Sequence, residues 1–102
     1  MTLAEIKFAF AQRERVVMPR GSVTIMRPMV IRALTTVRRT EFEEERGKGG
    51  YYHEVQLIDS TGRGWISASP EQLDPAEPEK FASMMARYRE LERRRAEAHA
   101  EG

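Results

Sequence analysis

The 102-residue chain contains no cysteine, which excludes a disulfide framework and thiolate chemistry and suits a reducing compartment. Its two histidines, His53 and His99, cannot build a usual zinc site without cysteine. No apolar run approaches the roughly 20 residues that a membrane-spanning helix needs. The start, MTLAEIKF, is too short and too polar for a signal peptide. We therefore expect a soluble cytoplasmic protein that binds no metal and does not enter a membrane.

Catalytic and phosphate-binding motifs are also missing. His53 precedes Glu54, but neighbouring residues on a strand point to opposite faces, so the two cannot act together on one side. The segment from Gly47 to Gly50 contains glycine and lysine, yet it lacks the spacing of a P-loop and its Ser or Thr. Ser60 and Ser67 have no base near them in any recognisable pattern. We expect no enzyme, no catalytic residue, no cofactor and no small-molecule substrate.

The segment from Tyr51 to Leu73 carries the clearest structural pattern. Aromatic, aliphatic and β-branched residues alternate with polar ones from Tyr51 to Ile58, which predicts a half-buried strand. Asp59 to Gly64 supplies turn chemistry, and Gly64 to Ser67 begins a second strand. Ser69 to Gln72 has a capping hydroxyl followed by proline. It leaves room for one turn only, so a 3₁₀ turn is expected.

Strand patterns also occupy the first part of the chain. Apolar residues from Ile6 to Phe10 alternate with Lys7 and Ala9, which predicts a first strand. Val23 and Ile25 predict a second one. Proline cannot donate a ladder hydrogen bond, so Pro28 should interrupt that strand and mark an edge, a bulge or a loop.

The longest run of strand formers extends from Met29 to Phe42. Two alternation registers compete within it, and a bulge that switches register would satisfy both. A helix from Val30 to Arg39 is the rival interpretation, but the β-branched residues argue against it. The charged, glycine-rich segment 43–50 should then join two antiparallel strands as a long, mobile hairpin loop.

The composition changes after Leu73. Asp74 to Pro78 is a linker or the start of a helix, and the rest of the chain consists of helix formers with no glycine before the last residue. One apolar stripe recurs there at helical spacing, formed by Phe81, Met84, Met85, Tyr88 and Leu91. Beyond Leu91 the stripe ends, so the last turns should stand in solvent or fray.

The order of strand, tight turn, Trp65-bearing strand and 3₁₀ turn resembles the end of an SH3-like small barrel. The opening IKFAFAQRERV also resembles barrels of the KOW, Tudor and bacterial SH3 type, although Ala11 stands where those usually have glycine. This resemblance covers roughly Ile6 to Leu73 and implies a fold, with no catalytic residues. Many such barrels are small accessory proteins of phages and mobile elements, and we expect the same setting here.

The expected fold is therefore β-rich α+β, an SH3-like small antiparallel barrel followed by a C-terminal α-helix. The chain length fits one domain with an appendage. We expect the barrel in residues 1–75 and the helix with a polar tail in residues 76–102.

Two kinds of partner are compatible with this fold. A protein partner or self-association is the first expectation, because the helix stripe must cover something, either a partner or the chain's own barrel. Its predicted contact residues are Phe81, Met84, Tyr88 and Leu91. The alternative is nucleic acid, because the chain carries +6 from Met1 to Arg39 and −4 from Thr40 to Gly62. The candidate residues for nucleic-acid contact are Arg27, Arg32, Arg38, Arg39, Tyr52 and Trp65.

Overall fold

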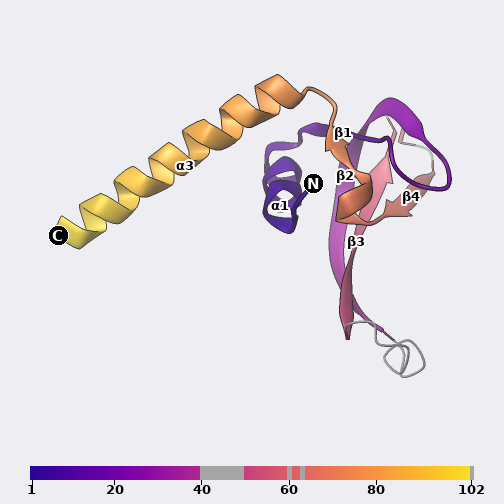
Figure 1. The fold of residues 1–102 in the computed structure, drawn as a ribbon, viewed down its shortest axis with the longest axis horizontal. Coiled ribbons are helices and arrows are strands. Elements are labelled where there is room, and N and C mark those ends of the chain that lie inside the picture. The colour runs from indigo at the N-terminus through magenta and orange to yellow at the C-terminus, as the bar shows by residue number, and fades with distance from the viewer. Residues whose placement is uncertain (40–49, 60, 63, 102) are drawn as a thin grey trace.

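The computed structural model describes residues 1–39, 50–59, 61–62 and 64–101, and it shows an α+β protein (Figure 1). Its elements in chain order are α1 (Leu3–Gln12), β1 (Arg15–Met18), β2 (Ile25–Arg38), β3 (Tyr51–Ile58), β4 (Trp65–Ala68), the 3₁₀ turn η1 (Pro70–Gln72), β5 (Asp74–Pro75) and α3 (Pro78–Glu101). The strands form one antiparallel five-stranded sheet in the order β4-β3-β2-β1-β5. The sheet formed by the described residues is open, so closure into an SH3-like barrel is not confirmed.

The first element, α1, is a helix, and the predicted strand from Ile6 to Phe10 is wrong. Thr2 and Glu5 form a capping box. The Thr2 backbone N–H donates to the Glu5 carboxylate at 2.8 Å, and the Glu5 N–H donates to the Thr2 hydroxyl at 3.2 Å. The Thr2 N–H also lowers the pKa of the Glu5 carboxyl. These bonds satisfy N–H groups at the start of the helix that have no partner within it, and a strand would not form them. The cap therefore favours a helix over the strand that the alternation predicts.

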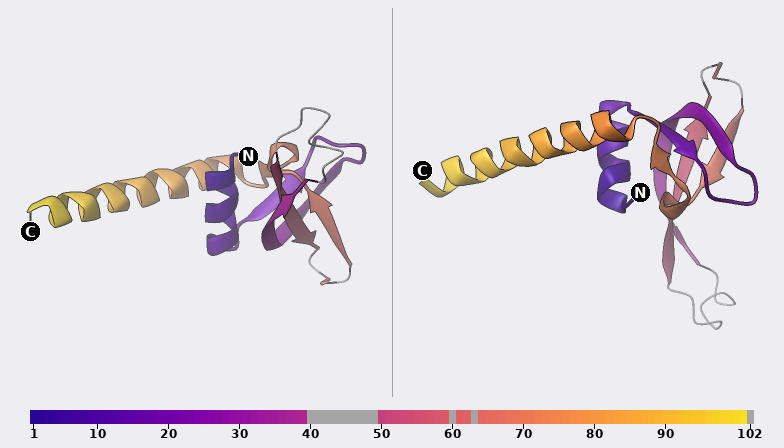
Figure 2. Two further views of the ribbon diagram at one scale, coloured as in Figure 1. Left: turned by 90° about the horizontal axis from the view of Figure 1, so that it is seen from below. Right: turned by 45° about the horizontal axis from the view of Figure 1, so that its top comes forward.

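The buried and exposed residues of α1 follow a helical period. Ile6 and Ala9, three residues apart, are both fully buried, whereas Phe10 is half exposed. Arg13 ends the helix in the left-handed conformation, with φ of 55°. Figure 2 shows α1 against one face of the sheet, which we call the core face.

The strand β2 runs through Pro28, so the predicted interruption at this residue is wrong. The pairing of β1 with β2 shifts in this region, from Val16 opposite Met29 to Met18 opposite Ile25. Pro28 therefore lies in an irregular part of the ladder, where a missing N–H is tolerated; of the three predicted alternatives, an edge, a bulge or a loop, the register shift fits the bulge.

A second irregularity in β2 confirms the predicted switch of register. Ile31 pairs with Leu57, but Leu34 pairs with Val55, so one residue of β2 is extra between these pairs. The switch keeps Ile31 and Leu34 on the core face although their numbers differ in parity. The segment is a strand as predicted. Of the loop predicted over residues 43–50, only Gly50 lies within the described residues.

The segment after β3 also follows the prediction for most of its length. Gly62 and Gly64 have φ of 70° and 69°, as the turn chemistry requires. The strand β4 and the 3₁₀ turn η1 are confirmed. Asp74 and Pro75, however, are not a linker, because they form β5 and pair with Val17 and Val16 at the edge of the sheet.

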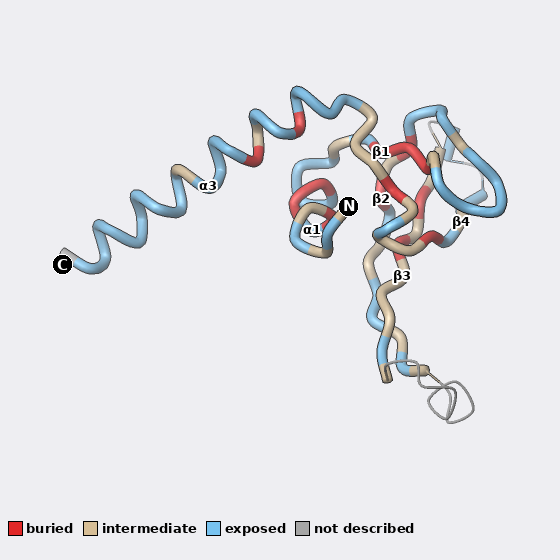
Figure 3. Tube along the Cα trace, viewed as in Figure 1, coloured by how far each residue is buried: buried red, intermediate tan, exposed pale blue. Residues whose placement is uncertain are grey.

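The core lies between α1, the sheet and the start of α3 (Figure 3). Its largest fully buried side chains are Ile6, Val16, Val55, Leu57 and Leu73. The predicted C-terminal helix is confirmed as α3, whose first turns bury Phe81 and Met85. No helix in the part of the chain that the structure describes is long and apolar enough to cross a membrane.

Candidate functional site

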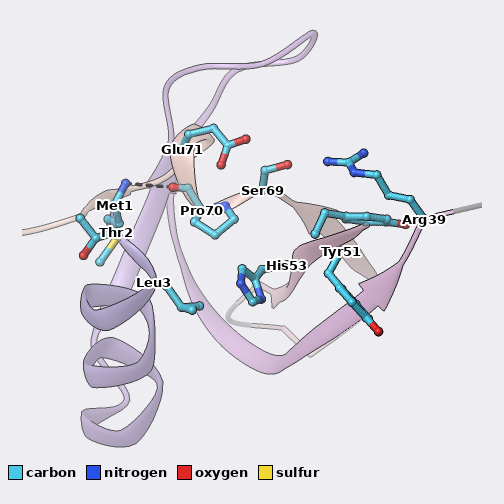
Figure 4. A pocket seen from close by; sticks show the side chains of 10 residues that line it. Met1, Thr2, Leu3, Arg39, Tyr51, His53, Ser69, Pro70 and Glu71 are labelled. Atoms are coloured by element: carbon cyan, nitrogen blue, oxygen red, sulfur yellow. Dashed lines mark hydrogen bonds between the residues drawn. The ribbon is translucent and has the colours of Figure 1, made fainter. Parts of the chain in front are cut away.

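A hollow of about 670 Å³ lies between the start of α1, the turn η1 and the first half of β3. Figure 4 shows His53 near the middle of this hollow, with Leu3 on the α1 side and Arg39 at the opposite end. Pro70 and Glu71 form the wall that η1 contributes. Three elements distant in sequence therefore meet around a space open enough to admit another chain.

The η1 wall of the hollow is fixed by contacts from both sides. The Met1 nitrogen donates to the carbonyl oxygens of Pro70 at 2.9 Å and Leu73 at 2.8 Å, which holds the start of α1 against η1 (Figure 4). Arg20 donates to the carbonyls of Glu71 and Leu73 at 3.0 and 3.2 Å. It also donates to both carboxylate oxygens of Asp74, and this holds the pKa of Asp74 below its usual value.

The edge of β3 that faces the hollow is open. β3 pairs with β2 along its whole length, but it pairs with β4 only from Val55 to Ile58. The Arg39 N–H donates to the Gly50 carbonyl at 2.7 Å, which sets the alternation of the β2–β3 ladder. The backbone groups of Tyr51 and His53 therefore point away from β2, toward the hollow. No other described residue hydrogen-bonds to them there.

Polar side chains surround this open edge. The Nδ1 atom of His53 lies 3.1 Å from the Thr36 hydroxyl, which fixes the position of the ring in the hollow. The Arg39 guanidinium lies 4.9 Å from the centre of the Tyr52 ring. Its Nε atom is buried and has no hydrogen-bond partner among the described residues. A carboxylate is the group that would satisfy such an arginine most strongly.

The residues predicted on the helix stripe have different surroundings in the structure. Phe81 is buried, and its ring packs edge-on against Phe8 of α1, with the ring centres 5.6 Å apart. Tyr88 also contacts Phe8, at 5.2 Å between ring centres, but it remains half exposed. Met84 is partly buried against the core, and Leu91 is 45% exposed. The chain itself therefore covers the first part of the stripe and leaves the second part open.

The residues predicted to contact nucleic acid fall into two groups. The Arg32 guanidinium lies 5.8 Å from the centre of the Trp65 ring, and Arg27 and Trp65 line one hollow of about 170 Å³. Arg39 lies over Tyr52 at the other end of β3. Arg38 pairs with Tyr51 in the ladder and alternates with Val37, so it lies on the opposite face from Tyr52.

Sequence analysis missed the open edge at Tyr51 and His53. The usable signal was the length of the two strands, because eight residues in β3 face only four in β4. No group of three histidine, aspartate or glutamate residues within the described ranges could hold a metal ion. The second histidine, His99, is exposed near the end of α3.

Comparison with protein families, with curated proteins and with solved structures finds no match to this chain.

Proposed function

We propose that this protein is a non-catalytic interaction module that takes an extended peptide of a partner protein along the open edge of β3. The observation that carries the proposal is the mismatch between β3 and β4, which leaves the backbone groups of Tyr51 and His53 directed into a hollow. An extended chain added to such an edge forms main-chain hydrogen bonds, and pockets beside the edge select its side chains.

The energies indicate what the peptide must supply. Tyr51 and His53 offer two N–H and two C=O groups, and each hydrogen bond contributes only about 0.5–1.5 kcal/mol net. Four bonds therefore give roughly 4 kcal/mol, which corresponds to a millimolar Kd before the cost of ordering the peptide. Useful affinity requires side chains in the hollow. Leu3 and Pro70 offer apolar surface there, and Arg39 offers a partner for a carboxylate. We expect an extended segment with an apolar residue and an Asp or Glu.

We also propose a fold type and a biological setting for this module. The turn after β3, the Trp65-bearing strand and η1 support an SH3-like small barrel, and this part of the resemblance does not depend on the opening segment that forms α1. We propose on that basis an accessory protein of a phage or mobile element. Assembly with a second copy of the chain is one form that the partner can take.

A second surface for a protein partner is the outer part of the α3 stripe. Phe81 and Met84 face the chain's own core, but Tyr88 and Leu91 are half exposed, and every residue from Leu91 to Ala100 is exposed. A partner helix on Tyr88 and Leu91 would extend the packing that begins at Phe81. Leu91→Ala tests this surface separately from the β3 edge, because it should weaken binding of a partner helix at Tyr88 and Leu91 and leave binding of a peptide at the β3 edge unchanged.

The test of the β3 edge uses a peptide selected from a random display library and amide exchange followed by nuclear magnetic resonance. In the free protein the amides of Tyr52 and Glu54 should exchange slowly, because they face β2, and those of Tyr51 and His53 should exchange quickly. Bound peptide should slow exchange at Tyr51 and His53. Protection confined to Tyr88 and Leu91 would move the site to α3 and contradict the edge.

A proline variant makes the test sharper. Tyr51→Pro removes an N–H that faces the hollow and leaves the β2 ladder intact, because the first residue of a strand tolerates proline. We expect about tenfold weaker peptide binding, which corresponds to loss of one hydrogen bond. Tyr51→Val is the matched control, since it removes the same ring but keeps the N–H. Equal binding by the proline and valine variants would contradict strand addition.

A further inference from the structure

The face of the sheet opposite α1, which we call the outer face, carries a row of residues that crosses four strands. Val30 pairs with Arg15 on one side and with Ile58 on the other, and Ile58 pairs with Trp65. Paired residues share a face, so all four side chains project from the same side. The row has an arginine at one end, an aromatic ring at the other and half-buried aliphatic residues between them. Trp65 is 51% exposed, so its ring is accessible.

A second aromatic ring lies on the same face. Tyr52 precedes Ile58 by six positions on β3, an even number, so both project from the outer face. Six residues of strand span about 20 Å. The exposed Trp65 and the half-buried Tyr52 therefore mark the two ends of a track along β3, and each has an arginine beside it. Arg32 lies 5.8 Å from the Trp65 ring centre, and Arg39 lies 4.9 Å from the Tyr52 ring centre.

The charge of the outer face favours an anion. Arg15 and Arg32 are exposed, and neither forms an ion pair with a described residue. The acidic side chain between the two rings is Glu54, which accepts a hydrogen bond from the Ser67 hydroxyl at 2.9 Å. An arginine that stacks on an aromatic ring keeps N–H groups available for phosphate. The hollow that Trp65 lines has one cation, Arg27, and one acidic residue, Asp59, in its wall, so the net positive charge of the face comes from Arg15 and Arg32.

We propose that the outer face binds single-stranded nucleic acid, with bases stacked at Trp65 and Tyr52 and phosphates held by Arg15 and Arg32. Stacking needs base faces that are free, which a single strand offers and a duplex hides inside its helix. The contacts involve ring faces and phosphates, so the track should tolerate many base sequences. This site lies on the outer face and the peptide edge lies at the rim of β3, although Tyr52 and Arg39 border both.

Binding is measured by fluorescence anisotropy, with a labelled oligothymidylate of about 12 nucleotides and a duplex of the same length. The parent protein should bind the single strand more tightly than the duplex, and the affinity should fall with salt as counterions are no longer released. Trp65→Ala should weaken binding about 5- to 150-fold, the usual effect of losing one stacked base. Arg32→Gln should weaken binding and make the salt dependence shallower by about one phosphate contact.

Two controls separate this site from a general charge effect and from the peptide edge. Arg87→Gln makes the same charge change as Arg32→Gln at an exposed position of α3, and it should leave affinity within about twofold of the parent. Tyr51→Pro should leave oligonucleotide binding unchanged. Equal losses in the Arg32 and Arg87 variants, parent-like binding by Trp65→Ala, preference for the duplex, or no binding to either probe would each overturn the proposal. Circular dichroism of each variant verifies that the fold is retained.

Discussion

The two halves of α3 have similar helix-forming compositions and opposite surroundings. In the first half Phe81 and Met85 are buried, and Met84 packs against the core. From Leu91 to Ala100 every residue is exposed, and Figure 1 shows this half extending away from the rest of the molecule. Helix propensity alone therefore does not distinguish a packed helix from a free one, and the apolar stripe does.

Different forces hold the two halves. The first half is fixed by rings, because Phe8 of α1 contacts both Phe81 and Tyr88. The second half depends on ion pairs along its own surface. Arg93 contacts Glu90 at 2.6 Å, and Arg94 contacts the same carboxylate at 3.2 Å. Such pairs stabilise a helix only weakly, so the second half should follow the first in folding and contribute little to global stability.

The largest expected effect comes from the packed half. Phe81→Ala removes a buried ring that contacts Phe8, and it leaves a cavity that the neighbouring elements fill only partly. We expect the free energy of unfolding to fall by about 3–5 kcal/mol, measured by denaturant titration. A loss below about 1 kcal/mol would show that α3 does not belong to the cooperative core and would remove the contrast between the halves.

A much smaller effect is expected at the boundary between the halves. Leu91→Ala truncates a side chain that is 45% exposed, so the free energy of unfolding should change by no more than about 0.5 kcal/mol. The melting temperature of the parent should also be independent of protein concentration. A melt that depends on concentration in the parent and not in Leu91→Ala would show that a second copy covers Leu91.

The segments that sequence predicted well are those where several local signals agree. From Tyr51 to Gln72 the alternation, the glycines of the turn and the Ser69-Pro70 start all favour the same elements. In α1 the signals conflict, because Ile6 to Phe10 alternates like a strand while Thr2 and Glu5 have the spacing of a capping box. The cap supplies real hydrogen bonds, whereas alternation over so few residues fits a short helix as well.

The candidate sites are formed by contacts between residues on different elements, and no local sequence pattern reveals such contacts. Helical spacing indicates that Phe81 and Tyr88 share a side of α3, but their partner Phe8 lies on an element that sequence predicted as a strand. Arg32, which approaches Trp65, is itself the residue at the register shift between Ile31 and Ala33. Sequence suggested a bulge in β2 without its position, so the faces of individual arginines could not be assigned.

The smallest effect on global stability is expected from the ion pairs of the second half. Glu90→Gln removes a carboxylate that accepts hydrogen bonds from both Arg93 and Arg94. The helical circular dichroism signal at low salt should decrease slightly, and the midpoint of global unfolding should stay unchanged. Glu92→Gln is the matched control, because it makes the same charge change at a carboxylate that forms no ion pair with a described residue.

The ion-pair origin of that signal has two further consequences. Added salt should remove the difference between Glu90→Gln and the parent, because exposed pairs are screened. Hydrogen bonding to Arg93 lowers the pKa of Glu90, so its stabilising effect on the helix persists at neutral pH. That effect should be lost only as the pH falls through the lowered pKa. If Glu90→Gln instead lowers the midpoint of global unfolding as Phe81→Ala does, the second half of α3 is part of the core, and the two halves do not differ in the way that their burial indicates.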